Sequence, residues 1–200
     1  CASVQVTGVV TRHTSPFNAD FIDLTPLCVT HGIPIFYADN ADNAAMCDWI
    51  RRHAPGICFC IGWSDLLGRE ILAIPDLGVI GYHPTLLPRN RGRHPIIWAL
   101  ALGLSETGSS LFFMTEGADS GAIISQVRVE IFDADDAASL YDRLLDILEV
   151  QLRQIALGLG SGALKSIPQD HFTATYWRKR SSVDGQIDWR MPASGIYNLV

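Results

Sequence analysis

Residues 79–95 read Val79-Ile80-Gly81-Tyr82-His83-Pro84-Thr85-Leu86-Leu87-Pro88-Arg89-Asn90-Arg91-Gly92-Arg93-His94-Pro95. The first part is a mostly apolar run that ends on a histidine, which is typical of a strand covered on both faces of a parallel sheet. Two prolines and a glycine restrict the path of the polar loop that follows. Because ligands bind beyond the carboxyl ends of strands in an open parallel sheet, His83 is a candidate site residue.

Three similar apolar runs precede this stretch, at residues 4–11, 33–39 and 57–63, and they alternate with helical segments. Asp42 can cap a helix that carries Trp49 and Ile50, and Ser64 or Asp65 can open one that carries Ile71 and Leu72. This βαβαβ order predicts an α/β fold: a Rossmann-like open, mainly parallel twisted sheet with helices on both faces.

The C-terminal half continues with helices and strands. A helix is expected from Pro95 to Gly103, and strands at residues 109–115 and 122–131 flank a loop, 116–121, whose two glycines can take positive φ. A long helix is capped by Asp136 or Ser139 and stops at residues 158–162. Its apolar stripe is expected to face the core, and consists of Leu140, Leu144, Leu148, Leu152 and Ile155.

From Lys165 onward the apolar periodicity weakens. Residues 173–189 are polar, aromatic and extended, as in a strap that leaves the domain. We therefore expect a domain over residues 1–172 and, over 173–200, a strap with the start of a linker helix. The chain begins in mid-strand and ends inside a helix, which indicates truncation at both ends, including the opening strand.

Composition excludes several classes of protein. With 200 residues, 48% hydrophobic and 18% charged, the chain is predicted to be one soluble, cytoplasmic domain with no membrane span. Its net charge of −6 argues against an extended nucleic-acid partner. The five cysteines are expected to be free core thiols, and neither they nor the six histidines have zinc-ligand spacing, so no metal is predicted.

Asp119, in the two-glycine loop, is the second candidate. Its carboxylate could orient the His83 ring or favour the protonated ring that supports an oxyanion. Taken alone, a single histidine is more often structural, and an aspartate in a turn often caps that turn. The residues by themselves leave these alternatives open.

The sequence resembles the formyltransferases that use 10-formyltetrahydrofolate. The resemblance covers residues 57–131 and 173–200, and it is carried by His83-Pro84-Thr85-Leu86-Leu87-Pro88, Arg91-Gly92, Glu106-Thr107-Gly108, Glu116-Gly117-Ala118-Asp119-Ser120-Gly121 and Asp184-Gly185-Gln186-Ile187-Asp188-Trp189. It implies the formyltransferase fold and an enzyme of one-carbon metabolism. In such enzymes an amine attacks the formyl carbon directly, with no covalent enzyme intermediate.

The resemblance also implies roles for individual residues. His83 would bind the oxyanion and help to move protons, and Asp119 would orient His83 and assist proton removal from the amine. The pterin of the donor would lie against Ile61, Gly62, Trp63, Thr115, Glu116, Gly117, Ala118 and Gly121. Arg91 is expected to anchor the loop by bonding backbone carbonyls, because a guanidinium has five donors.

One position departs from the family pattern. Gly81 stands where the family usually has an asparagine that donates a hydrogen bond to the formyl oxygen. Loss of one oxyanion donor can cost about 10²–10³ in rate. Either another donor (Ser64, Thr115 or Asn90) or water replaces it, or the substrate is held differently, or activity is reduced or lost.

The amine substrate is expected to be a nucleotide-linked amino sugar. Arg91-Gly92-Arg93 with Pro95 and Trp98 looks most like the sugar-nucleotide formyltransferases. The alternatives are methionyl-tRNA formyltransferase, which the shortage of basic residues disfavours, and a non-catalytic homologue that binds folate or a sugar nucleotide. The sequence leaves a homodimer open.

Overall fold

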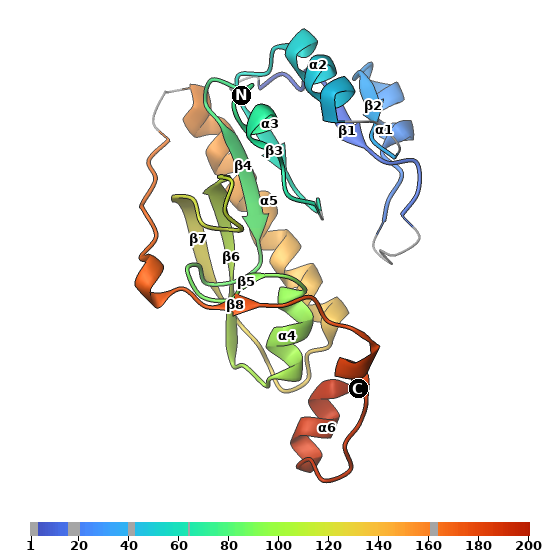
Figure 1. The fold of residues 1–200 in the computed structure, drawn as a ribbon, viewed down its shortest axis with the longest axis vertical. Helices are drawn as coiled ribbons and strands as arrows, with labels where there is room; N and C mark the ends of the chain where they lie inside the picture. Colours follow the sequence, from blue (N-terminus) through green and yellow to red (C-terminus); the bar gives the residue numbers. More distant parts are fainter. Residues whose placement is uncertain (1–3, 16–20, 40–42, 64, 161–163) are drawn as a thin grey trace. The chain divides into compact units, whose positions relative to one another are not determined.

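The computed structural model describes residues 4–15, 21–39, 43–63, 65–160 and 164–200. Figure 1 shows the elements in chain order. The strands are β1 (Val9–Thr11), β2 (Ile35–Tyr37), β3 (Cys58–Cys60), β4 (Val79–His83), β5 (Arg91–Gly92), β6 (Glu106–Phe113), β7 (Ile123–Glu130) and β8 (Tyr176–Trp177). The α-helices are α1 (Thr25–His31), α2 (Asn43–His53), α3 (Arg69–Leu72), α4 (Pro95–Ala101), α5 (Ala137–Gly160) and α6 (Ala193–Leu199), and the short 3₁₀ helices are η1 (His171–Thr173) and η2 (Ser182–Gly185).

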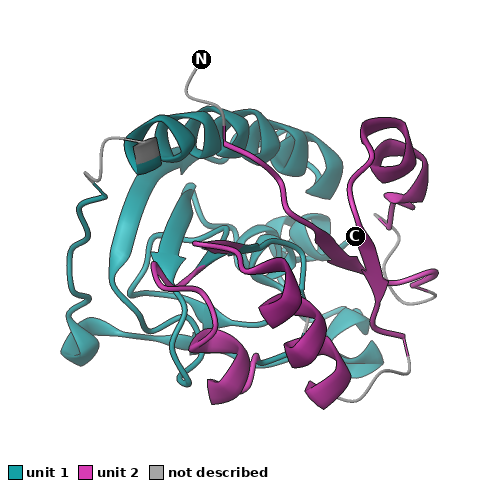
Figure 2. Cartoon of the chain, turned by 90° about the horizontal axis from the view of Figure 1, so that it is seen from above, with its two compact units in different colours: residues 1–2, 59–66, 80–200 teal, residues 3–58, 67–79 magenta. Residues whose placement is uncertain are grey.

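The chain divides into two compact units, shown in Figure 2. Unit 1 comprises residues 1–2, 59–66 and 80–200, and unit 2 comprises residues 3–58 and 67–79. Every candidate catalytic and donor-binding residue belongs to unit 1.

Unit 2 contains a small parallel sheet and the first helices. Strands β1 and β2 pair in parallel with Val9 opposite Ile35, as the alternation of strands and helices predicted. The core of this unit is built from the apolar face of α2 together with α3, and its buried members are Met46, Cys47, Ile50 and Ile71. The predicted cap Asp42 lies outside the described residues.

Two elements of this region are shorter than expected. The first strand covers only Val9–Thr11, because Val4 and Val6 are exposed and pair with no strand. The helix expected to open at Ser64 or Asp65 is confined to Arg69–Leu72 and begins after Gly68; Leu66 is exposed, and Ser64 lies outside the described residues.

Unit 1 is built on the sheet with strand order β3-β4-β6-β7. Strand β4 pairs antiparallel with β6, with Tyr82 opposite Leu111, and β6 pairs antiparallel with β7. This antiparallel arm is a feature that the sequence reading did not distinguish. The short loop between β6 and β7 accounts for the antiparallel pairing of these two strands, because a parallel pair needs a longer crossover.

Helix α5 packs along one face of this arm (Figure 1). The Ser139 amide donates to the Asp136 carboxylate at 2.8 Å, so Asp136 is the cap, as one of the two alternatives predicted. The apolar stripe faces the core as expected: Leu140, Leu144, Leu148 and Ile155 are buried. The helix continues through Gly158 to Gly160.

The C-terminal strap belongs to unit 1. Its strand β8 pairs in parallel with β5, with Gly92 opposite Trp177. Helix α6 contacts α4, where Gly103 lies close to Asn198. The boundary after residue 172 stays a prediction.

The described part of the chain contains no helix that is both long and apolar enough to cross a membrane. Cys28 and Cys47 are buried, whereas Cys58 and Cys60 are half-buried, which is less than expected of core thiols. Burial raises the pKa of the Cys58 thiol.

Candidate active site

His83 is the last residue of β4 and is buried, with 5% of its surface exposed. Its Nε2 atom lies 2.8 Å from the backbone carbonyl of Asn90. Since a carbonyl only accepts hydrogen bonds, Nε2 carries a proton and donates it there. Asn90 is itself held in a left-handed conformation (φ 61°) by its amide, which donates to Thr175 Oγ1 at 2.8 Å. The His83 ring therefore has a defined orientation, with Nδ1 as the ring nitrogen left for chemistry.

Asp119 lies beside that nitrogen. Its Oδ2 atom is 3.7 Å from His83 Nδ1, within ion-pair distance but longer than a hydrogen bond. The same oxygen accepts a hydrogen bond from the Gly92 amide at 2.8 Å. The carboxylate thus bridges to a segment 27 residues away in the sequence instead of capping its own turn. The structure brings the two candidates together at the end of β4.

In the loop between β6 and β7, the residue with positive φ is not one of the two glycines, as the sequence had suggested. Positive φ occurs at Asp119 (φ 49°), and neither Gly117 nor Gly121 is among the residues with positive φ. A glycine is required at position 121 because the backbone of Phe113 packs against it, and a Cβ atom there would lie 1.7 Å from the Phe113 carbonyl oxygen. Within the loop, Thr115 Oγ1 and Ser120 Oγ are 2.9 Å apart, and Ser120 Oγ donates to the Gly117 carbonyl.

Arg91 is buried, with 1% of its surface exposed, in the loop that follows β4. Its guanidinium donates to Gln169 Oε1 at 2.7 and 3.2 Å, to the Tyr176 hydroxyl at 2.8 Å, and lies 3.2 Å from His171 Nδ1. The prediction that Arg91 bonds backbone carbonyls was wrong, because its partners are side chains. Gln169 and His171, which precede the strap, and Tyr176 on β8 surround Arg91 and take up its donors.

Gly81 lies two residues before His83 on the same strand, so both positions face the same side of the sheet. A Cβ atom on Gly81 would lie 2.8 Å from Met114 Cγ and 3.0 Å from Phe112 Cζ. The space that an asparagine would need is therefore filled by the chain's own Met114. The sequence reading missed this residue, because a single methionine after a strand gives no signal of its partner.

Thr115 and Asn90, two of the candidate replacement donors, already make hydrogen bonds within the protein. Thr115 Oγ1 is bonded within its own loop, and Asn90 Oδ1 accepts from Thr175 Oγ1 at 3.1 Å. Ser64 lies outside the described residues. A thioether cannot donate a hydrogen bond, so Met114 does not substitute for the asparagine.

The expected pterin-binding residues form two groups in unit 1. Ile61 is 42% exposed, and Gly62 (φ 69°) faces open space. In the β6–β7 loop, Thr115, Glu116 and Gly117 are exposed, Ala118 is half-buried and Gly121 is buried. Trp63 is half-buried. Exposed loop backbone of this kind can offer N–H and C=O groups to a flat heterocycle.

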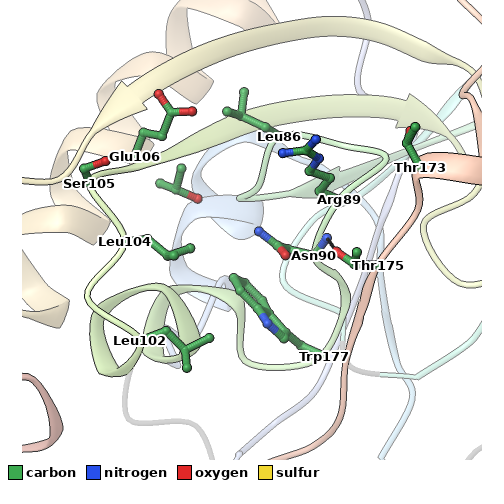
Figure 3. A pocket seen from close by; sticks show the side chains of 11 residues that line it. Leu86, Arg89, Asn90, Leu102, Leu104, Ser105, Glu106, Thr173, Thr175 and Trp177 are labelled. Atoms are coloured by element: carbon green, nitrogen blue, oxygen red, sulfur yellow. Dashed lines mark hydrogen bonds between the residues drawn. The ribbon is translucent and has the colours of Figure 1, made fainter. Parts of the chain in front are cut away.

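A cavity of about 580 Å³ is bordered by the loop that follows β4 (Figure 3). It is lined by Leu86, Arg89, Asn90, Leu102, Leu104, Ser105, Glu106, Thr107, Thr173, Thr175 and Trp177. Neither His83 nor Asp119 lines it. The expectation that those two residues share the wall of one cleft stays a prediction.

His94 stands at the start of α4 with a left-handed backbone (φ 55°). It is half-buried, whereas Arg93 is exposed. Burial, followed by the charges of Arg93, Lys179 and Arg180, lowers the pKa of the His94 imidazole. Among the described residues, no group of three or more His, Cys, Asp or Glu side chains could hold a metal ion.

Comparisons with known proteins extend this geometry. The sequence model of the formyl transferase family matches residues 3–156. The structure of WlaRD, a sugar 3N-formyl transferase crystallised with dTDP and 5-N-formyl-THF, is similar with a TM-score of 0.76 at 17% identity, over 96% of this chain and 67% of that one.

Two further solved structures share the fold. The N-formyltransferase from Helicobacter canadensis, in complex with folinic acid and dTDP-3-aminofucose, matches with a TM-score of 0.72 at 17% identity, over 91% of this chain and 64% of that one. HypX from Aquifex aeolicus matches with a TM-score of 0.72 at 17% identity, over 96% of this chain and only 34% of that one. The chain therefore spans between one third and two thirds of the length of these proteins.

Proposed function

Because the chain belongs to the formyl transferase family, we propose that it moves a formyl group from 10-formyltetrahydrofolate to the primary amine of a nucleotide-linked amino sugar. The observation that carries the proposal is the placement of the Asp119 carboxylate 3.7 Å from His83 Nδ1 at the end of β4. The substrate class is suggested by two similar structures, one described as a sugar 3N-formyl transferase and the other holding folinic acid and dTDP-3-aminofucose.

His83 is assigned the acid–base role. Since its Nε2–H is committed to the Asn90 carbonyl, Nδ1 is the atom that, when it carries the second ring proton, donates a hydrogen bond to the developing oxyanion. The Asp119 carboxylate lies against the same side of the ring and can accept a proton from the amine. During transfer, the amine nitrogen bonds to the formyl carbon and loses a proton, while the bond from that carbon to the folate nitrogen breaks and that nitrogen gains a proton.

The formyl donor is a substrate, and its pterin is assigned to Ile61, Gly62, Trp63 and residues 115–118 with Gly121. The exposure of Ile61 and the open space above Gly62 fit an occupant at that position. The exposed backbone of the β6–β7 loop fits a ring edged with donors and acceptors.

A second candidate is a homologue that binds these ligands without turning them over. The packing of Met114 into the space beside Gly81 favours it, because this site lacks the amide donor at that position. Against it stands the His83–Asp119 pair, which a pure binding protein has no chemical need to keep.

The test is formyl transfer by the full-length protein. We expect a gain of one formyl group, measured by mass, when 10-formyltetrahydrofolate is incubated with one member of a panel of nucleotide amino sugars. His83→Ala and Asp119→Asn should each lower kcat by about 10²–10⁴-fold. His53→Ala, which removes a histidine bonded only to the Trp49 carbonyl on α2, is the matched control and should leave kcat unchanged.

Two results would contradict the proposal. Tight binding of folate and sugar nucleotide with no formyl transfer would favour the binding homologue. Formyl transfer that survives both His83→Ala and Asp119→Asn would place the chemistry elsewhere.

A further inference from the structure

Gln169 lies in the segment between α5 and η1 and is buried, with 6% of its surface exposed. Its amide group makes four hydrogen bonds. Oε1 accepts from Arg91 Nε and Nη2 at 3.2 and 2.7 Å, and Nε2 donates to the carbonyls of Asp119 and Gly121 at 2.9 and 2.6 Å. These bonds use both donors and both acceptor positions of the side chain.

Together with the hydrogen bond between Gly92 and Asp119, the four bonds of Gln169 form a closed circuit of contacts that includes Asp119. Arg91 precedes Gly92, whose amide donates to Asp119 Oδ2 at 2.8 Å. One side of the circuit therefore holds the carboxylate of Asp119, and the other side, through Gln169, holds its backbone carbonyl. The link between the two sides is the Arg91 guanidinium.

Asp119 needs such support because its backbone is left-handed (φ 49°), a conformation that is strained for a non-glycine residue. The next fixed point is Gly121, whose carbonyl also accepts from Gln169. Two anchored carbonyls on either side of Ser120 determine the direction in which the Asp119 side chain leaves the loop. That direction brings Oδ2 to 3.7 Å from His83 Nδ1.

We propose that Gln169 is a positioning residue for formyl transfer, whose amide holds the β6–β7 loop in the conformation that directs the Asp119 carboxylate toward Gly92 and His83. Its catalytic consequence rests on the proposed function. Its structural consequence does not, because the Gly92–Asp119 hydrogen bond can be observed without turnover.

The alternative is that Gln169 only fills buried space and satisfies Arg91. Gln169→Glu separates the two roles. It keeps the side-chain volume and an oxygen for Arg91, but it removes the NH₂ group that donates to the two loop carbonyls. Gln169→Leu removes both sets of bonds.

The experiment measures the Gly92 amide and the kinetics in the same proteins. In wild type, the bond to a carboxylate should give a downfield amide proton that exchanges slowly with solvent. In Gln169→Glu and Gln169→Leu we expect that resonance to move upfield and its exchange to accelerate about tenfold or more. The value of kcat should fall by about 10²-fold with KM for both substrates nearly unchanged, since misplacement of about 1 Å can cost that much.

Gln151→Leu is the matched control. Gln151 is also a buried glutamine. It lies on α5 and bonds Ser109 and Ser125, on the face of β6 opposite to that of Ser110, the register partner of His83. Its substitution should lower the melting temperature but leave the Gly92 resonance and kcat in place. If Gln169→Leu does not fold, Gln169→Glu alone distinguishes a positioning role of Gln169 from a purely space-filling one.

The outcomes separate the two hypotheses. A Gly92 resonance that stays at its wild-type position in Gln169→Glu overturns the inference, whatever happens to kcat. A Gly92 resonance that moves in a protein whose wild type formylates no amine supports the positioning of Asp119 and refutes the proposed function. A moved resonance with unchanged kcat overturns the catalytic part of the inference.

Discussion

At the scale of single residues, Gly81 and Met114 act as a pair. The side-chain space of Gly81 holds Met114 and Phe112, so Gly81→Asn should overpack the site and lower both stability, by about 1–3 kcal/mol, and kcat. Gly81→Asn combined with Met114→Ala should recover the lost stability, because the asparagine then occupies the vacated volume. Thermal unfolding and steady-state rates of the two variants measure this.

Met114→Ala alone is the control, and it should create a small cavity without adding a donor. If the asparagine restores an oxyanion donor, the double variant should exceed wild type in kcat. A Gly81→Asn variant that is fully stable and faster than wild type without any change at Met114 would contradict this account.

Tyr82 gives the second prediction at this scale. Within the described residues its buried hydroxyl has no hydrogen-bond partner, and burial raises the pKa of Tyr82 to about 12. A hydrogen bond from Ser109 would lower the pKa of Tyr82. However, the Ser109 hydroxyl donates its proton to Gln151 Oε1 at 2.6 Å and therefore has none to donate to the Tyr82 oxygen. Tyr82→Phe should therefore leave stability unchanged or raise it by about 1 kcal/mol.

The control for Tyr82→Phe is Tyr37→Phe, which removes a hydroxyl bonded to Thr25 at 2.7 Å and should destabilise by about 1 kcal/mol. Chemical denaturation measures both. The absorbance titration of wild type minus Tyr82→Phe should show one tyrosine that ionises near pH 12. A loss of stability in Tyr82→Phe equal to that in Tyr37→Phe would show that the hydroxyl is paired.

At the scale of elements, the start of α5 depends on Asp135. Its carboxylate accepts from Arg143 at 2.6 and 2.9 Å and from the Phe132 amide at 2.8 Å. The Arg143 bond, followed by the bonds from Phe132 and Ser139, holds the pKa of the Asp135 carboxyl far below its usual value of 3.8. Asp135→Asn should destabilise by about 1–2 kcal/mol at pH 7.

The pH dependence of this effect has a definite sign. A carboxyl whose pKa is lowered by folding stabilises the protein above its unfolded pKa, and that contribution is lost as the pH falls toward the folded pKa. The stability difference between wild type and Asp135→Asn should thus be constant above about pH 5 and shrink steadily below about pH 4. A difference that is independent of pH down to pH 2 would refute the assignment.

Some elements could be predicted from local pattern and others could not. Helix α5 carries a long 3.6-residue stripe and a reciprocal Asp136–Ser139 cap, so both its face and its start follow from the sequence. The antiparallel arm could not be distinguished in the same way, because a buried apolar strand looks alike in either direction. The segment at Leu66 also looked helical, but only the turn at Arg69–Leu72 forms.

At the scale of the whole molecule, the site combines predictable and unpredictable parts. The roles of His83 and Asp119 were expected from their family pattern, and the structure places them 3.7 Å apart. The partners of Arg91 were not predictable, because Gln169 and Tyr176 lie 78 and 85 residues away and meet it only in the folded chain. Long-range polar contacts of this kind leave no periodic signal in a single sequence.

Docking of the strap gives the last prediction. Gly92 has φ 107°, and a Cβ atom there would lie 2.2 Å from the Trp177 carbonyl oxygen, a backbone atom that side-chain adjustment cannot move. Gly92→Ala should therefore separate β5 from β8 and pull the Gly92 amide away from Asp119. We expect a loss of about 2 kcal/mol or more in stability, faster proteolysis within residues 170–190, and a fall in kcat.

Gly185→Ala is the matched control in the same strap, because a Cβ atom there meets nothing within 4 Å and its backbone is not left-handed. It should change none of the three measurements. If Gly92→Ala unfolds the chain globally, the proteolysis pattern will spread over both units instead of concentrating in the strap. Wild-type resistance of residues 170–190 in Gly92→Ala would mean that the β5–β8 pairing does not hold the strap, and that the environment of Arg91 has to be maintained by other contacts.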